Sequence, residues 1–322
     1  MKLLEVEDLT TYYQLKEGYV RACENIYLHL DQGEALGLVG ESASGKTTAA
    51  LSLVKLLPDN AHIMHGSIRI NGREIASATE EELRHIRWKE IAIIFQGAMN
   101  ALNPVRRVGD QIVEALRIHD QLTEKEACRR TAELFEKVEI DPERIREYPH
   151  EFSGGMRQRV MIAMAIACNP KIVIGDEPTT ALDVMVQAQV LQLLEQLRRE
   201  RQMGMVLITH DLSVVGETCE RVAVMYASCI VETGPTEKVF DRPAHPYTRA
   251  LIAAFPNIEG ERRLATSIPG NPPNLLCPPS GCRFHERCSE ALERCREEEP
   301  LSVDLSPGHA ASCHLLQGMV RR

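Results

Sequence analysis

Strand-length apolar runs alternate with helical patterns over the first three-quarters of the chain. Each run has four or five mostly apolar residues, and together they lie at 36–39, 91–95, 171–175, 205–208 and 222–226. Apolar positions recur at helical spacing over 46–57, 183–201 and 211–219. This alternation of strands and helices predicts an α/β domain.

Three departures from the alternation divide the chain. Residues 67–70 alternate apolar and polar side chains before Asn71-Gly72, a pair that favours a two-residue hairpin turn. Charged, helix-favouring sequence at about 100–150 predicts a helical insert. After Gly234-Pro235 the alternation stops and the chain becomes rich in proline. The predicted organisation is a domain over 1–240, with a helical subdomain at about 98–165, and an extension over 241–322.

The composition is that of an ordinary globular protein, with 44% hydrophobic and 26% charged residues among 322. A formal net charge of −9 argues against a general nucleic-acid binder, which needs a basic face, but it permits a local basic groove. No apolar stretch approaches the roughly 18 residues of a membrane-spanning helix. The first ten residues contain three acids and no apolar core, so no export signal is expected there. We therefore expect a reducing compartment, in which thiols stay free or bind metal.

Residues 40–47 read Gly-Glu-Ser-Ala-Ser-Gly-Lys-Thr and fit the phosphate-loop pattern G-x-x-x-x-G-K-[ST] between a predicted strand and a predicted helix. The glycines let backbone N–H groups turn toward phosphate oxygens, and the helix adds its positive N-terminal end. Lys46 can reach the β- and γ-phosphates, while the Thr47 hydroxyl can hold Mg²⁺. The candidate nucleotide contacts are Gly40, Glu41, Ser42, Ala43, Ser44, Gly45, Lys46, Thr47 and Thr48.

The apolar run at 171–175 is followed by two acids, Asp176 and Glu177. In a phosphate-loop protein an acid at such a strand end contacts Mg²⁺, often through water, and this role falls to Asp176. Glu177 lies one position further and can orient or deprotonate the attacking water. A plain pair of solvated acids at a strand end would have the same pattern.

Ser153-Gly154-Gly155 precedes a helical stretch rich in alanine and methionine. A serine and two glycines at a helix start expose several unpaired N–H groups, which form a candidate anion-binding site in addition to the phosphate loop. For the segment taken alone, a capped helix start with flexible glycines is the favoured interpretation.

These motifs together resemble the nucleotide-binding subunits of ABC transporters. The phosphate loop, the SGGMRQR segment, the IVIGDEP strand and a later histidine follow one another in that family's order. Lys46 and Asp176 are 130 positions apart, and His210 lies 33 positions after Glu177, as in the family. The resemblance covers about residues 3–240. It implies an α/β P-loop NTPase of the ABC ATPase type, with an N-terminal antiparallel β subdomain and a helical subdomain insert.

The resemblance also implies roles for single residues. Gln96 resembles the glutamine that touches Mg²⁺ and the attacking water and senses the membrane subunit. His210 resembles the switch histidine that contacts the γ-phosphate, although a lone histidine at a strand end is usually structural. Asp183 resembles the acid of the loop that crosses the dimer interface. Tyr13 resembles the aromatic residue that stacks on adenine, and its neighbour Tyr12 competes for this role.

The signature segment completes the implied site. Ser153, Gly154, Gly155 and Gln158 resemble the residues that bind the γ-phosphate of ATP held by the opposite subunit. The implied catalytic residues are Glu177, His210, Gln96 and Lys46, and the implied Mg²⁺ contacts are Thr47, Gln96 and Asp176. Gly175 and Ser228 stand where the family pattern has alanine and glycine, and neither bears directly on the chemistry.

Cysteines are concentrated in the extension, which contains five of the ten. Cys282, Cys288, Cys295 and Cys313 are separated by five, six and seventeen residues, within sequence that has little apolar core of its own. Such a group suggests a metal that stabilises the fold. Zinc usually needs closely spaced cysteine pairs, disulfides are disfavoured in a reducing compartment, and an iron–sulfur cluster tolerates wide spacing. The other candidate thiol nearby is Cys277.

The extension resembles that of the dipeptide and oligopeptide importer ATPases. Gly281-Cys282-Arg-Phe-His-Glu-Arg287-Cys288 matches their GC-x-F-x-x-RC core, and His245-Pro-Tyr-Thr248 also resembles this branch. In dipeptide-importer members the four thiols hold a [4Fe-4S] cluster, so the resemblance implies this cluster here, with zinc as the runner-up. Cys23, Cys128, Cys168, Cys219 and Cys229 are expected to be small buried apolar residues.

The implied function is that of an ATP-hydrolysing subunit that energises import of dipeptides or oligopeptides, with ATP and Mg²⁺ as cofactors. The implied partners are a second ABC ATPase subunit, favoured to be a paralogue, two transmembrane permease subunits and an extracytoplasmic solute-binding protein. The chain would lie peripherally on the cytoplasmic face of the plasma (inner) membrane and bind no nucleic acid. Importers of nickel complexes or oligosaccharides use similar subunits, so they remain alternatives.

Two other classes of protein fit less well. ABC ATPases that repair DNA insert long coiled coils before the signature, whereas only 56 residues separate Gln96 from Ser153 here. Ribosome-associated members usually carry two cassettes, and this chain has one. A structural metal-binding protein with vestigial motifs conflicts with the intact Lys46, Asp176 and Glu177.

Overall fold

A computed structural model describes residues 2–97, 101–180, 182–254 and 268–317. The chain divides into two units, each with its own dense set of contacts. The acid-strand unit comprises residues 1–4, 30–34 and 70–208, and the phosphate-loop unit comprises residues 5–29, 35–69 and 209–322. Part of the predicted helical subdomain (98–100) and parts of the predicted extension (255–267 and 318–322) lie outside the described residues.

Three parallel strands form the sheet of the acid-strand unit. They are β6 (Ile91–Ile94), β7 (Ile172–Asp176) and β8 (Gly204–Ile208). Ile91 of β6 pairs with Ile172 of β7, so the carboxyl ends of these two strands lie side by side. Every residue of β7 and β8 is buried, as expected of short apolar runs that do not alternate. The strands predicted from the apolar runs at 91–95, 171–175 and 205–208 are therefore confirmed.

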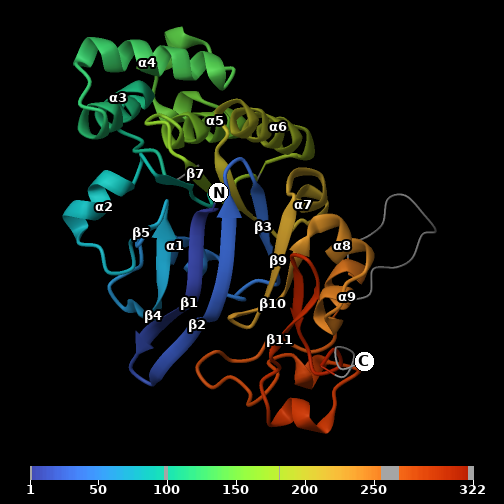
Figure 1. Ribbon diagram of the computed structural model, residues 1–322. Helices are drawn as coiled ribbons and strands as arrows, with labels where there is room; N and C mark the ends of the chain where they lie inside the picture. The colour runs from blue at the N-terminus through green and yellow to red at the C-terminus, as the bar shows by residue number, and fades with distance from the viewer. Residues whose placement is uncertain (1, 98–100, 181, 255–267, 318–322) are drawn as a thin grey trace. The chain divides into compact units, whose positions relative to one another are not determined.

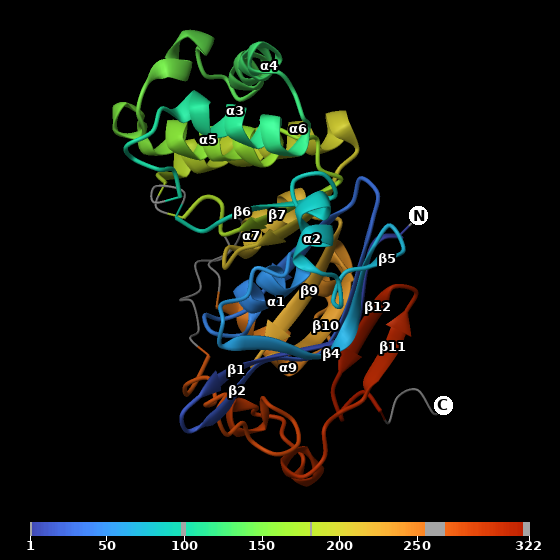
Figure 2. The same ribbon diagram turned by 90° about the vertical axis from the view of Figure 1, so that its left-hand side faces the viewer.

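Five α-helices of the described chain also belong to this unit (Figure 1). They are α2 (Glu80–Ile86), α3 (Val108–His119), α4 (Glu124–Lys137), α5 (Gly154–Ala165) and α6 (Val184–Arg201), with 3₁₀ turns at Pro142–Arg146 and Pro149–Glu151. Figure 2 shows α3, α5 and α6 side by side, with α4 packed against α3. Their apolar faces enclose a core that includes Ile112, Phe135, Ile162 and Leu194. The charged sequence around 100–150 is therefore helical, as predicted, and the helices pack their apolar side chains into this core.

An antiparallel sheet opens the phosphate-loop unit. The long strands β1 (Lys2–Leu15) and β2 (Gly18–Asp31) are joined by a two-residue turn, and β1 lies between β2 and β4 (Ala61–Ile70). The N–H of Gln14 donates to the C=O of Asn60 at 2.7 Å. This sheet is the antiparallel β subdomain that the family resemblance implies.

The predicted hairpin turn follows β4. Asn71 and Gly72 have φ angles of 50° and 76° and lead into β5 (Arg73–Glu74). Two successive positive φ angles are what a tight hairpin turn with the right strand twist requires, which is why asparagine and glycine are favoured there. The turn is confirmed.

A second sheet of the phosphate-loop unit carries the phosphate loop. Strand β3 (Ala35–Val39) runs parallel to β9 (Arg221–Tyr226), and β10 (Cys229–Pro235) is antiparallel to β9. Helices α1 (Lys46–Leu53) and α7 (Leu212–Thr218) belong to the same unit. The prediction of a helix over 46–57 was too long, because α1 ends at Leu53 and Lys55 adopts a left-handed φ of 48°.

The C-terminal extension adds strands that the sequence did not predict. Strand β12 (His309–Ser312) pairs with β10. Strand β11 (Ser302–Ser306) pairs with β12, and Figure 2 shows the two side by side. Two short helices, α8 (Thr236–Asp241) and α9 (Pro246–Ala253), follow β10. The extension is thus built into the sheet of the phosphate-loop unit. Among the described residues, no helix is both long and apolar enough to cross a membrane.

Candidate functional site

The phosphate loop follows β3 directly, and two of its glycines are required by the backbone around them. Gly40 and Gly45 have φ angles of 152° and 106°, which favour glycine. A Cβ on Gly40 would collide with the C=O of Met225, and a Cβ on Gly45 would collide with the C=O of Ala22. Both glycines therefore allow the loop to lie against neighbouring strands while its outer residues stay accessible.

Lys46 is enclosed by the loop that precedes it. Its Nζ donates to the C=O of Gly40 at 2.7 Å, to the C=O of Glu41 at 2.8 Å and to Oγ of Ser44 at 3.2 Å. The side chain is buried, whereas that of Thr47, the second residue of α1, is exposed. An ammonium group held among loop carbonyls is placed to meet phosphate oxygens.

The two candidate adenine-stacking tyrosines have different surroundings. Tyr13 OH lies 3.3 Å from Oγ1 of Thr48, beside the first turn of α1. Tyr12 OH donates to Oε1 of Glu24 at 2.6 Å, and its partial burial together with that carboxylate raises its pKa to about 12. Of the two hydroxyls, the one on Tyr13 is hydrogen-bonded to a residue of the phosphate-loop segment.

The acidic half of the site lies at the carboxyl ends of β6 and β7, within the acid-strand unit. Asp176 is buried at the end of β7. Glu177 follows with a left-handed φ of 47°, and its N–H donates to the C=O of Ile208 at 2.8 Å. Nε2 of Gln96 donates to Oε2 of Glu177 at 2.7 Å, and Oγ1 of Thr180 donates to the same oxygen at 2.9 Å. The structure thus brings together two residues that lie 81 positions apart in the sequence.

The signature segment begins α5 with its serine as the N-cap. Oγ of Ser153 accepts from the N–H of Met156 at 3.3 Å. Gly155 allows close packing, since a Cβ there would collide with the side chain of Val186 on α6. Gln158 is buried on the next turn, and its Nε2 has no hydrogen-bond partner among the described residues. The capped helix start and the anion-binding interpretation are both compatible with this arrangement.

The remaining predicted residues lie at the starts of helices. Asp183 is the N-cap of α6, where its Oδ1 accepts from the N–H of Val186 at 3.0 Å. His210 is exposed just before the N-cap of α7, Asp211. Tyr13, the phosphate loop and His210 belong to the phosphate-loop unit, and Gln96, Ser153, Asp176, Glu177 and Asp183 belong to the acid-strand unit.

The four thiols of the extension share one neighbourhood. Burial, together with smaller contributions from the nearby thiols of Cys295, Cys313 and Cys288, raises the pKa of Cys282 to about 11. Cys282, Cys295 and Cys313 are buried, whereas Cys277 is exposed. The N–H of Cys282 donates to the C=O of Cys295 at 2.8 Å, which holds two thiol-bearing turns together.

Backbone N–H groups are directed at three of these sulfurs. Hydrogen bonds come from Phe284 to Cys282, from Glu290 to Cys288 and from Leu315 to Cys313, in each case from the residue two positions later. Each of them favours the thiolate and so lowers a pKa that burial raises. N–H groups turned toward thiolates suit iron–sulfur or zinc ligation. Within the described ranges, however, no three His, Cys, Asp or Glu side chains are arranged closely enough to hold a metal ion.

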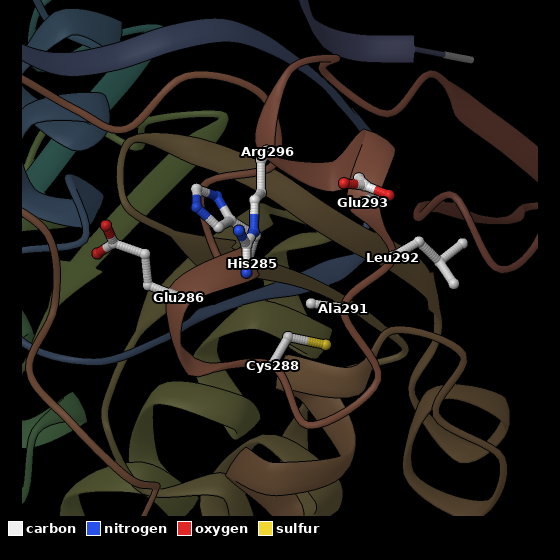
Figure 3. A pocket seen from close by; sticks show the side chains of 7 residues that line it. All are labelled: His285, Glu286, Cys288, Ala291, Leu292, Glu293 and Arg296. Atoms are coloured by element: carbon white, nitrogen blue, oxygen red, sulfur yellow. The ribbon is translucent and has the colours of Figure 1, made fainter.

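A hollow of about 790 Å³ adjoins this thiol region. Figure 3 shows its lining, with the sulfur of Cys288 among the side chains and the carboxylate of Glu286 set apart from them. The lining residues are His285, Glu286, Cys288, Ala291, Leu292, Glu293 and Arg296. Only one of the four thiols, that of Cys288, lies on this hollow.

Two contacts to the phosphate loop were missed by the sequence interpretation. Tyr247 OH accepts from the N–H of Glu41 at 2.9 Å, and the guanidinium of Arg287 pairs with the Glu41 carboxylate. Tyr247 lies in the segment 245–248 and Arg287 in the segment 281–288, which from the sequence served only to identify the type of extension. The sequence contains no signal that would link these motifs to a loop more than 200 positions earlier.

Comparisons with known proteins bear on the whole chain. Residues 23–180 match the model of the "ABC transporter" family, and residues 231–295 match the "Oligopeptide/dipeptide transporter, C-terminal region". A probable peptide ABC transporter ATP-binding protein of Sinorhizobium fredii is 47% identical over 97% of this chain and 94% of its own length. The oligopeptide transport ATP-binding protein OppD of Salmonella typhimurium is also 47% identical, over 97% and 93%.

A solved structure shares the fold. The dimeric ATP-binding cassette MJ0796, in a post-hydrolysis state bound to ADP and phosphate, is 27% identical with a TM-score of 0.65. The match covers 72% of this chain and 98% of that cassette.

Proposed function

Because this chain belongs to the ABC transporter family of ATP-binding subunits, in its oligopeptide/dipeptide branch, we propose that it hydrolyses ATP to drive peptide import through a membrane-spanning partner. The observation that carries the hydrolytic part is the contact between Gln96 and Glu177 beside the buried Asp176. A chain that also encloses a lysine within a phosphate loop has the groups that ATP hydrolysis needs.

The chemistry is an in-line attack of water on the γ-phosphorus. Glu177 accepts a proton from this water or orients it, and the amide of Gln96 holds the Glu177 carboxylate in place. Lys46 offsets the negative charge of the phosphate oxygens. Thr47, Gln96 and Asp176 would hold Mg²⁺, which neutralises phosphate charge when it is bound.

We assign the other predicted residues to the opposite face of a subunit pair. Ser153, Gly154, Gly155 and Gln158 would contact the γ-phosphate held by a second ATPase subunit, and Asp183 would lie at the interface. The capped N-terminus of α5 supports this role, because its glycine N–H groups offer donors to an anion. The likeness to a dimeric cassette bound to ADP and phosphate supports the pairing. His210, exposed before α7, would contact the γ-phosphate.

The proposal extends to the assembly. The second ATPase is a paralogue in this proposal, and the pair works with two permease subunits and a solute-binding protein that selects the peptide. The chain would lie on the cytoplasmic side of the membrane. The ATPase domain would end near residue 240, and residues 241–322 would form the extension.

We further propose that Cys282, Cys288, Cys295 and Cys313 hold a [4Fe-4S] cluster. The burial of Cys282, Cys295 and Cys313 and the N–H groups directed at three of the four sulfurs support thiolate ligation. A bound cluster would cross-link segments of the extension and would supply a one-electron redox group. Exposed Cys277 is not among these ligands.

A transport measurement tests the proposed function. The chain is purified with its permease subunits, placed in vesicles with the solute-binding protein, and supplied with ATP and a labelled oligopeptide. We expect peptide uptake that depends on ATP and stops in the Lys46→Ala variant, which loses the charge that meets the phosphates. Uptake of nickel or an oligosaccharide in place of peptide would contradict the cargo, and uptake that persists in Lys46→Ala would contradict the mechanism.

Tyr13 provides a separate test of nucleotide binding. We expect Tyr13→Ala to weaken binding of a fluorescent ATP analogue about tenfold, because stacking of a base on an aromatic ring contributes about 1–3 kcal/mol. Tyr12→Phe is the matched control, since it removes only the hydroxyl that contacts Glu24. Equal binding by wild type and Tyr13→Ala would remove Tyr13 from this role.

A further inference from the structure

Two residues of the extension bind Glu41, the second residue of the phosphate loop. The N–H of Glu41 donates to the hydroxyl of Tyr247 at 2.9 Å. Its carboxylate accepts hydrogen bonds from both terminal nitrogens of Arg287, from Nη1 to Oε2 at 2.6 Å and from Nη2 to Oε1 at 2.9 Å. Backbone and side chain of the same loop residue are therefore held by two residues from beyond position 240.

The side chain of Arg287 is buried, and all three of its guanidinium nitrogens donate hydrogen bonds. Its side chain is only 5% exposed. Beyond the pair with Glu41, its Nε donates to the C=O of Pro269 at 2.7 Å, and its Nη1 donates to the hydroxyl of Tyr226 at 3.2 Å. A planar guanidinium can make these bonds at once, whereas a lysine ammonium lacks the fork that meets both carboxylate oxygens. The geometry therefore requires arginine at this position.

The position of Arg287 is set by a short turn that lies between two candidate thiolates, Cys282 and Cys288. Arg287 ends the 3₁₀ turn His285–Arg287, directly before Cys288, and its N–H donates to the C=O of Phe284 at 3.0 Å. The ring of Phe284 packs against Tyr226 and Tyr247 with centroids 5.1 and 5.4 Å apart. A shift of this turn would move the guanidinium away from the phosphate loop.

We propose that Arg287 is a positioning residue for ATP, which holds the phosphate loop in its binding geometry and neutralises the Glu41 carboxylate beside the triphosphate site. The proposal rests on ATP binding by the phosphate loop. Without Arg287, Glu41 would place an unpaired negative charge on a loop that must receive a highly charged anion. The extension would then control nucleotide affinity through one ion pair.

The test is an equilibrium titration of the purified full chain with a fluorescent, non-hydrolysable ATP analogue. We expect Arg287→Gln to weaken binding about tenfold, on the order of 1.4 kcal/mol. Glu41→Gln introduced into the same variant should restore binding to within about threefold of wild type, because the uncompensated carboxylate is gone. Arg296→Gln is the matched control, an exposed arginine of the same extension that lines the hollow beside Cys288, and it should bind like wild type.

Rescue separates a positioning role from simple damage to the extension. If Arg287→Gln and the double variant were equally weak, the loss would come from disrupted packing and the proposal would be wrong. Binding by Arg287→Gln equal to that of Arg296→Gln would also overturn it. Circular dichroism shows whether Arg287→Gln folds. If it does not, Arg287→Lys and Tyr247→Phe would replace it, and each is expected to weaken binding of the analogue about threefold. Unchanged binding in both variants would overturn the proposal. Absence of binding by the wild type would instead contradict the proposed function.

Discussion

Replacement of Glu177 by glutamine is expected to slow ATP hydrolysis by about a thousandfold while ATP binding persists, because a general base in such a site contributes roughly 10²–10⁴ in rate. The glutamine amide has nearly the same shape as the carboxylate but cannot accept a proton from water. Gln96 and Thr180, which both donate to Oε2 of Glu177, can still bond to an amide oxygen. The change therefore removes the chemistry and leaves the local structure in place.

The same variant should accumulate as a closed pair of subunits with ATP. If ATP binding closes the pair and hydrolysis weakens the closed state, a subunit that cannot hydrolyse stays closed. Phosphate release measures the rate, and size-exclusion chromatography with ATP measures the pair. Glu81→Gln on the exposed surface of α2 is the control and should hydrolyse ATP normally. Normal turnover by Glu177→Gln would remove Glu177 from its role.

Replacement of Cys295 by serine is expected to abolish metal binding by the extension. Cys295 is buried, and its thiol lies near those of Cys282 and Cys313. With one of four ligands changed, a cluster or a metal would be bound too weakly to survive purification. The wild type, purified without oxygen, should be brown and absorb near the blue edge of the visible spectrum, with iron and sulfide in equal amounts.

Cys277→Ser is the matched control for this experiment, since Cys277 is an exposed thiol in the same extension. It should keep the colour and the iron of the wild type, whereas Cys295→Ser should be colourless and should unfold at a lower temperature. Loss of iron in Cys277→Ser would show that the ligands had been misassigned. If the wild-type protein were colourless and contained stoichiometric zinc, the site would be assigned to zinc and the cluster proposal would be wrong.

The local sequence was sufficient for the elements that carry the chemistry. The buried strands β3, β7 and β8 are continuous apolar runs, and Asn71-Gly72 requires the turn that the structure has. The phosphate loop could be recognised because its glycines and lysine are adjacent in sequence. The position of Glu177 after β7 followed from the order of residues alone, while its catalytic role remains a prediction.

The strands of the extension could not be predicted in this way. Strands β11 and β12 are only five and four residues long, and several of their positions are polar or exposed. They form because β10 provides an edge with free N–H and C=O groups, and pairing satisfies them. A short strand of this kind carries little pattern of its own, so its existence depends on its partner.

What the sequence determined, then, is whatever depends on neighbours along the chain: the apolar strands, the helix starts, the hairpin turn and the phosphate loop. Only the tertiary structure decided which distant residues meet. Gln96 meets Glu177 because β6 and β7 are parallel neighbours whose carboxyl ends coincide. Arg287 meets Glu41 across 246 positions because packing buries the guanidinium beside the partly exposed Glu41 carboxylate, and a buried charge needs an opposite charge as its partner. Such pairings follow from packing in three dimensions, which local sequence patterns do not encode.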